Sequence, residues 1–372
     1  MLAAMETIRG LLKGERLSHP IPPMDGALSP NDRLDVLETL DLDVRVPDDV
    51  STDGRGGLLV SSETSLLAIH ADGTGTSLAT FETPISAFSR LTDGSLVVAV
   101  DDDGLHHVDA QGQSLATARK LDGAILAGVT ALTPDGHGGV YFTVGSTRYR
   151  AGEWVRDLME GNRNGLLGHW IPGCEPTLLR DGLAFPNGVL AEAGGHRLLI
   201  TESWTHSVSR YSIEGGALGS PQTLIGNLPG YPARIGAASG GGYWLAIFAM
   251  RTQLVELILR DKPFKRDMMR SLDPEFWIRP ALSSSGSHLE PLQIGGIRRL
   301  GISKPWAPPR SYGLVLRIDG EGEVIDSMHS RTDGRHHGIT AVREIDGRLV
   351  IVSRGNHRLL VAPLESHSGS LS

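Results

Sequence analysis

Six polar residues from four distant parts of the chain are of the types that hydrolyse esters or lactones. They supply two carboxylates, one amide, one guanidinium and two imidazoles, at Asp48, Asp49, Asn187, Arg234, His336 and His337. A carboxylate or an imidazole can take a proton from water, while an amide or a guanidinium can stabilise an oxyanion. If the fold brings these residues to one pocket, they predict hydrolysis of a small ester or lactone.

A recurring unit of strand, tight turn and strand predicts the elements that position these residues. Its turns, each rich in Asp or Gly, lie at Asp53, Asp93, Asp135, Gly194, Gly240 and Asp346. The early copies are spaced by roughly 40 residues, which is the period of a four-stranded propeller blade. We therefore predict an all-β fold, a six-bladed β-propeller, with the innermost strands beginning around one central pocket.

The repeat also predicts where the propeller begins and ends. Residues 1–35 are expected to form an N-terminal arm, with a short helix where apolar residues recur at helical spacing. Residues 36–366 would form the propeller and 367–372 a flexible tail. Because an open ring leaves a long unpaired edge, the segment DRLDVLETLDLDVRV is expected to add a closing strand to the last blade.

The long gap between the fifth and sixth turns predicts an insertion in blade five, over about 260–310. Met268, Met269, Leu272 and Phe276 recur there at helical spacing, so we expect the insertion to be partly helical. Two roles remain open for it. The helices either pack against the side of the propeller or cover the central pocket as a lid.

Composition excludes several classes of protein and partner. The net charge of −8 leaves no broad basic surface for nucleic acid. The single cysteine, Cys174, rules out an internal disulfide. No apolar run reaches the length of a membrane-spanning helix, so we expect no membrane partner. The expected partner is a small-molecule substrate. The N-terminus lacks the apolar core of a signal peptide, which favours a cytoplasmic location.

The segment DGLAFPNGVLAEAGGHRLLITESWTHSVSRYSI resembles the strictosidine synthase-like branch of six-bladed propellers related to gluconolactonase, regucalcin (SMP-30) and paraoxonase. Two later segments, NLPGYPARIGAASGGGYWLAI and SYGLVLRIDGEGEVIDSMHSRTDGRHHGITAVREIDGRLVIVSRGNHRLLVAPL, are similar to the last two blades of that branch. The resemblance covers roughly residues 40–364. It implies a six-bladed propeller with its site in the central pocket.

The lactonases of this family imply a calcium ion, or another divalent cation, at the bottom of the pocket. Asn187 matches the metal-binding Asn of the family, and Asp48 falls where many members have a Glu. Other ligand positions are lost, because an Asp-Asn pair of the family is replaced here by Ala233 and Arg234. Calcium prefers six to eight oxygen ligands, so Arg234 could take over the electrostatic role of the ion.

Three further residues are expected in the pocket. Glu202 and Trp204 lie in a loop of blade four, and Thr340 falls where strictosidine synthases carry their catalytic glutamate. The first hypothesis is an ester or lactone hydrolase in which His337 or Asp48 activates water, while Asn187 and Arg234 polarise the carbonyl. The alternatives are a metal-independent, strictosidine synthase-like enzyme that forms or breaks C–N or C–C bonds, and a non-catalytic ligand-binding propeller.

Overall fold

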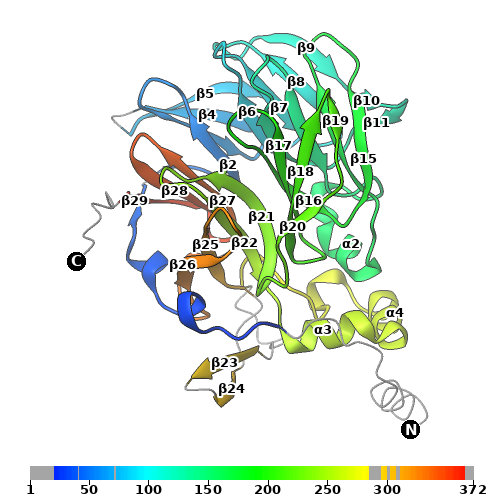
Figure 1. Ribbon diagram of the computed structural model, residues 1–372, viewed down its shortest axis with the longest axis vertical. Helices are drawn as coiled ribbons and strands as arrows, with labels where there is room; N and C mark the ends of the chain where they lie inside the picture. Colours follow the sequence, from blue (N-terminus) through cyan, green and yellow to red (C-terminus); the bar gives the residue numbers. More distant parts are fainter. Residues whose placement is uncertain are drawn as a thin grey trace.

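The predicted six-bladed β-propeller is confirmed, and its blades surround a central axis (Figure 1). The computed structural model describes residues 21–40, 42–70, 73–284, 295–299, 302–306 and 311–364, with only the backbone for 295–299 and 302–306. Most of the predicted N-terminal arm, including its helix, and the tail lie outside these residues. Among the residues that are described, no helix is long and apolar enough to cross a membrane.

Each blade runs outward from an innermost strand. Blade one contains β2 (Pro47–Thr52), β3 (Leu58–Ser62), β4 (Ser65–Ile69) and β5 (Gly75–Thr80). Blade two contains β6 (Ile85–Arg90), β7 (Leu96–Val100), β8 (Gly104–Val108) and β9 (Ser114–Ala118). Blade three contains β12 (Val129–Pro134), β13 (Val140–Val144), β14 (Gly165–Trp170) and β15 (Thr177–Leu183). Blade four contains β16 (Pro186–Ala191), β17 (Arg197–Glu202), β18 (Ser207–Glu214), β19 (Ala217–Leu218) and β20 (Gln222–Ile225). Blade five contains β21 (Gly230–Ala237), β22 (Tyr243–Met250), β25 (Gly313–Ile318) and β26 (Val324–Ser330). Blade six contains β27 (Ile339–Ile345), β28 (Arg348–Ser353), β29 (Arg358–Pro363) and β1 (Glu38–Thr39).

The ring is closed at its inner and its outer strands. The innermost strands contact one another in the order β2, β6, β12, β16, β21, β27 and back to β2. At the outside, β1 pairs antiparallel with β29, with Glu38 opposite Val361, so blade six contains both ends of the propeller. This pairing confirms the predicted closing strand. Apolar side chains fill the spaces between blades, as where Val50 of blade one packs in one cluster with Ala341 of blade six.

The six predicted turns all connect the first and second strands of a blade, and in two of them an Asp explains the shape of the turn. Asp53 Oδ1 accepts hydrogen bonds from the backbone N–H groups of Arg55 and Gly57, at 2.6 and 2.8 Å. Asp135 repeats this arrangement with the N–H groups two and four residues further on. The carboxylate thus satisfies the donors that the turn leaves unpaired, while Gly54 takes the left-handed conformation with φ of 76°.

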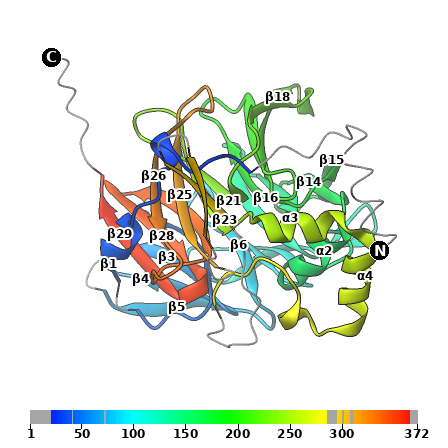
Figure 2. The same cartoon turned by 90° about the horizontal axis from the view of Figure 1, so that it is seen from below.

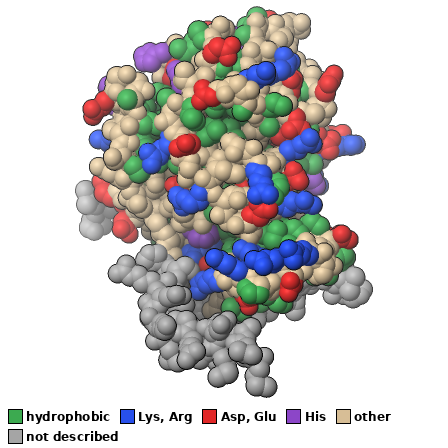
Figure 3. All heavy atoms as spheres, turned by 90° about the vertical axis from the view of Figure 1, so that its right-hand side faces the viewer, with side chains coloured by type: hydrophobic (Ala, Val, Ile, Leu, Met, Phe, Trp, Pro, Cys, Tyr) green, Lys and Arg blue, Asp and Glu red, His purple; other side chains and the backbone are tan. Residues whose placement is uncertain are grey.

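The insertion in blade five joins β22 to β25, so it begins before the predicted residue 260. It contains α3 (Gln253–Arg260), α4 (Lys262–Ser271), η4 (Pro274–Phe276), β23 (Gly295–Arg299) and β24 (Ile302–Trp306). Met268 of α4 and Ile258 of α3 pack on Met159 of α2 (Trp154–Glu160), which lies between β13 and β14 (Figure 2). The outer side of these helices carries Lys and Arg side chains in a row (Figure 3). The helices therefore pack against the α2 helix of blade three.

Every innermost strand contains a register shift just after it begins. The shifts lie between Pro47 and Val50, Ile85 and Ala87, Val129 and Ala131, Pro186 and Gly188, Pro232 and Ile235, and Ile339 and Ala341. A bulge leaves its extra residues outside the hydrogen-bonded ladder and re-aims their side chains. The bulged residues are Asp48, Asp49, Ser86, Thr130, Asn187, Ala233, Arg234 and Thr340. The same backbone irregularity, used six times, gathers these residues at one end of the axis.

Candidate active site

A central pocket of about 330 Å³ opens at the end of the axis where the innermost strands begin. Its polar lining includes Asp48, Ser86, Thr130, Asn187, Arg234, Thr340, Arg354 and His357. Its apolar lining includes Val46, Val129, Trp154, Phe185, Phe248 and Leu282. Strand starts and the loops between second and third strands together form the walls. Leu282 shows that the blade-five insertion reaches the pocket through the segment after its helices.

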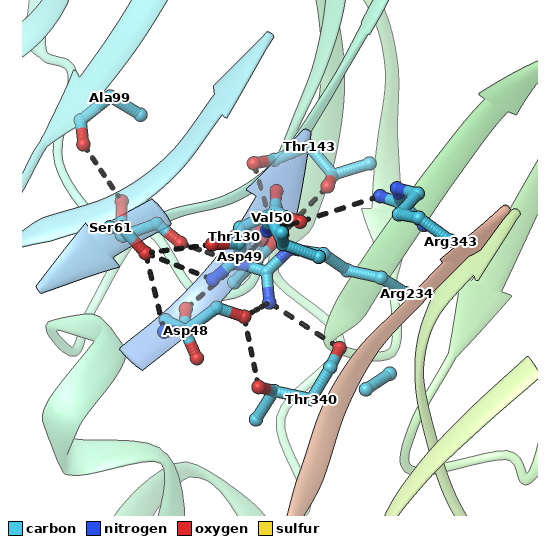
Figure 4. A network of polar contacts seen from close by, with 12 residues as sticks. Asp48, Asp49, Val50, Ser61, Ala99, Thr130, Thr143, Arg234, Thr340 and Arg343 are labelled. Atoms are coloured by element: carbon cyan, nitrogen blue, oxygen red, sulfur yellow. Dashed lines mark hydrogen bonds and ion pairs between the residues drawn. The ribbon is translucent and has the colours of Figure 1, made fainter. Parts of the chain in front are cut away.

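Arg234 lines this pocket, and its guanidinium lies at the centre of a network of polar contacts (Figure 4). Its Nη2 lies 2.8 Å from Asp48 Oδ2 and 2.8 Å from the backbone oxygen of Thr130, and it also donates to the backbone oxygen of Ser86. Its Nη1 donates to the backbone oxygen of Asp48 at 3.0 Å. Innermost strands from blades one, two and three thus direct oxygen atoms at a single cation contributed by blade five.

Two buried carboxylates hold that cation in place. Arg234 Nη2 pairs with Asp48, and its Nε lies 3.2 Å from Asp49 Oδ2. Burial opposes the charge of the guanidinium, but Asp48 and Asp49 outweigh it and raise the pKa of Arg234. Asp49 is 2% exposed, and its Oδ1 lies 3.6 Å from Nη2 of Arg343. The prediction that Asp49 lines the substrate pocket is therefore wrong, because Asp49 is not among the residues that line the cavity.

Asp48 reaches the pocket between two guanidinium groups. Its Oδ2 contacts Arg234, and its Oδ1 lies 2.6 Å from Nη1 of Arg354. Burial raises the pKa of a carboxyl, but the two arginines outweigh that effect and lower the pKa of Asp48 below its ordinary value. The hydroxyl of Thr340 donates to the backbone oxygen of Asp48 at 2.9 Å, so Thr340 also lies in the pocket, as predicted.

The oxygen atoms on the axis do not fit a calcium ion, because a guanidinium already occupies their centre. Asp48 and the carbonyls of Ser86 and Thr130 point at Arg234. Asn187 lines the pocket at the family position but brings only one further oxygen. In the described part of the chain, no group of three or more His, Cys, Asp or Glu residues is placed to hold a metal. A permanent side-chain cation thus stands at the site that the family resemblance assigns to a metal.

We accordingly expect calcium to leave the thermal stability of the protein unchanged. Arg234 already neutralises the carboxylates, so neither millimolar calcium nor a chelator should move the melting temperature by more than about 1 °C. A calcium site filled at 100 times its Kd would instead add about 2.7 kcal/mol to the free energy of unfolding. Differential scanning fluorimetry with calcium, magnesium and EDTA measures this. A calcium-dependent rise that EDTA reverses would show that the ion displaces Arg234.

The two predicted histidines do not line the pocket. Nε2 of His337 lies 2.7 Å from the backbone oxygen of Arg331, and its Nδ1 lies 2.9 Å from the Ser311 hydroxyl. Burial lowers the pKa of both His336 and His337. Because a carbonyl can only accept, Nε2 of His337 carries the proton and its Nδ1 accepts from Ser311. The imidazole is committed at both nitrogens, so the structure contradicts its assignment as a base that activates water.

Glu202 and Trp204 support the pocket wall from behind instead of lining it. Glu202 Oε1 accepts a hydrogen bond from the backbone N–H of Ala184 at 2.8 Å, and so fixes the loop before β16. Trp204 donates from Nε1 to Asp157 at 2.7 Å, and its ring stacks on Phe185 with centroids 4.3 Å apart. Phe185 is the side chain that faces the cavity. The prediction that Glu202 and Trp204 line the pocket is therefore wrong, since Phe185, from the segment before β16, lines the cavity here.

Sequence reasoning missed five polar residues of the pocket, one of which is Ser283 in the segment after the insertion helices. Ser86 and Thr130 occupy the bulges of blades two and three, and their signal is their place near the start of each innermost strand. The other two, Arg354 and His357, lie in and after η5 (Arg354–Asn356), the loop between β28 and β29.

Comparison with known proteins agrees with this architecture. The family model for strictosidine synthase matches residues 131–216. The adipocyte plasma membrane-associated protein of Rattus norvegicus is 27% identical over 80% of this chain and 86% of its own length. Strictosidine synthase-like protein 6 of Arabidopsis thaliana is 32% identical over 46% of each chain.

Solved structures show the same fold at low sequence identity. A gluconolactonase from Xanthomonas campestris superposes with a TM-score of 0.58 and 15% identity, over 93% of this chain and 96% of its own. Regucalcin from Agrobacterium tumefaciens gives 0.55 and 14%, over 88% and 92%. The fold and pocket thus define a six-bladed propeller with its site on the axis. The chain is similar to strictosidine synthase-like proteins over part of its length and shares the fold of the gluconolactonase and regucalcin propellers.

Proposed function

We propose that this propeller hydrolyses a small ester or lactone bound in the central pocket. The observation that carries the proposal is the position of Asp48, the single carboxylate among the described residues that line the cavity. Two guanidinium groups keep it ionised. Asn187 lies in the same cavity, and its amide makes no hydrogen bond to another described residue.

The proposed reaction needs one proton acceptor and one donor for the carbonyl oxygen. Water attacks the carbonyl carbon while its proton passes to Asp48, and the carbonyl oxygen becomes an oxyanion held by the amide of Asn187. The C–O bond of the ester then breaks, and the departing alkoxide takes the proton back from Asp48. Since its low pKa makes Asp48 a weak base, most of the acceleration must come from positioning and from the oxyanion donor.

A non-catalytic ligand-binding propeller is the second candidate. It is favoured by the fact that both oxygens of Asp48 already contact guanidinium groups. The strictosidine synthase-like reaction has less support, because Thr340 offers a hydroxyl where that reaction uses a carboxylate. The nearby Glu344 bonds to Trp244 and to the backbone of Ser239, outside the pocket. A cytoplasmic location, favoured by the sequence, stays a prediction.

A panel of lactones and aryl esters tests the proposal. We expect turnover by the wild-type protein. The His337→Gln variant should keep kcat/KM within about threefold of the wild-type value, since His337 does not reach the cavity. Acid release in a pH-stat measures the rate. A hundredfold loss in His337→Gln, with its melting temperature retained, would return the base assignment to that histidine. Ligand binding without turnover would support the second candidate.

A further inference from the structure

The ion-pair network under and beside the pocket carries one positive charge in excess. Arg234, Arg343 and Arg354 contribute three guanidinium groups, whereas Asp48 and Asp49 contribute two carboxylates. No other Asp or Glu lies among the described residues that line the cavity. In a confined pocket of low dielectric constant, such an excess favours a ligand of opposite charge.

The excess charge is exposed at Arg354. Its side chain is 32% exposed, and its Nη1 donates to Asp48 Oδ1 at 2.6 Å. The other N–H groups of this guanidinium have no hydrogen bond to a described residue, although the side chain lines the cavity. Arg234, by contrast, directs its Nη groups at protein oxygens. Of the two arginines in the cavity wall, Arg354 is therefore the one able to bind a ligand.

His357 adds a second donor beside Arg354. The backbone N–H of Val46 donates to Nδ1 of His357 at 2.9 Å, so this nitrogen must present a lone pair. The proton of the neutral ring is consequently on Nε2, and Nε2 makes no hydrogen bond to a described residue. The left-handed backbone of His357, with φ of 56°, ends the η5 loop and brings both side chains to the same cavity.

One part of the pocket wall is apolar and largely aromatic. Trp154 and Phe248 meet edge to face with ring centroids 5.2 Å apart, and Phe185 lines the same cavity. Leu282 adds an apolar side chain beside Gly355 of the η5 loop. A ligand that fits the whole cavity therefore combines an apolar or aromatic body with an oxygen-rich anionic end. A cavity of about 330 Å³ suits a molecule of the size of a substituted aromatic acid.

We infer that the pocket selects an ester or lactone that also carries a carboxylate, which Arg354 and His357 bind while the aromatic wall holds its apolar body. This inference rests on the proposed hydrolysis at Asp48 and specifies its substrate class. Arg354 would bind one carboxylate oxygen through its free edge, and His357 Nε2–H would donate to the other. A charge-assisted hydrogen bond contributes about 1.5–3 kcal/mol, which corresponds to a preference of roughly 10- to 100-fold.

Matched substrates test the inference. One substrate is the monophenyl ester of succinic acid, which keeps one free carboxylate. The other is the phenyl ester of succinamic acid, in which a neutral amide replaces that carboxylate. The measured quantity is kcat/KM for the first substrate divided by kcat/KM for the second. We expect the natural chain to favour the carboxylate at least tenfold. Arg354→Met should reduce this ratio to about one, Arg354→Lys should restore part of it, and His357→Leu should lower it about threefold. Equal rates on both substrates in the natural chain would overturn the inference and leave the hydrolysis intact.

A control variant and a binding measurement separate the two proposals. Arg348→Met removes a cation from the far end of β28, outside the pocket, and should leave the ratio unchanged. If neither ester is hydrolysed, titration calorimetry with phenylacetate and phenylacetamide still decides the point. Tenfold tighter binding of phenylacetate that is lost in Arg354→Met supports the inference, and equal binding of the two probes refutes it.

Discussion

Replacing Arg234 with Met is expected to lower the free energy of unfolding by about 3–5 kcal/mol, because it leaves buried carboxylates without their partner. Asp49 is 2% exposed and would keep only the longer of its two arginine contacts, the one to Arg343. The carbonyls of Ser86 and Thr130 would lose the donor that joins blades two and three to blade five. Urea denaturation followed by circular dichroism measures the loss.

A matched surface variant controls for the loss of an arginine as such. Arg55 is exposed in the turn after β2, so Arg55→Met should change the free energy of unfolding by less than about 0.5 kcal/mol. Adding Asp49→Asn to Arg234→Met should recover part of the stability, since it removes one of the stranded charges. A loss below about 1 kcal/mol in Arg234→Met would show that the carboxylates are solvated or paired by other groups.

Replacing Asp48 with Asn is expected to reduce kcat/KM for ester hydrolysis by at least about 100-fold, because the amide cannot accept the proton of water. Asp53→Asn is the control. It changes a carboxylate of the same blade at the turn after β2, away from the pocket, and should keep kcat/KM within about threefold. An Asp48→Asn enzyme that retains its rate would remove Asp48 from the reaction.

The same carboxylate predicts how the protein responds to acid. Because the two arginines lower the pKa of Asp48, it stays ionised from pH 8 down to pH 5, and the rate should show no acid limb from this group in that range. A group with a lowered folded pKa stabilises the protein above its ordinary pKa. This stabilisation should disappear only as the pH falls below about 4. A fall in the unfolding midpoint between pH 7 and pH 5 must then come from another group.

The repeat accounts for how well the fold could be predicted. An Asp that accepts hydrogen bonds two and four residues ahead is a local device, so Asp53 and Asp135 specify their turns without help from the rest of the chain. Closure of the ring follows from the physical cost of an unpaired edge, and β1 pairs with β29 as expected. The limits of the insertion were less predictable, since helices that pack by apolar contacts give no sharp boundary.

The site could be predicted only in part. Asp48, Asn187 and Arg234 were found because each lies near the start of an innermost strand, and Thr340 was found through the family resemblance. His337 was misassigned, because the sequence shows an imidazole near the pocket face but not the Arg331 carbonyl that binds it.

By itself, the sequence determined the six blades, their closing strand and the residue types that reach the axis, because each depends on local turns or on the period of the repeat. Only the tertiary structure decided what those residues do. Arg234 contacts oxygens 104 to 186 positions away in the chain, and Arg354 pairs with Asp48 across 306 positions. Such contacts follow from the bulges and the closure of the ring. The choice between a metal and a guanidinium, and between a buried and a ligand-facing cation, therefore became visible only in three dimensions.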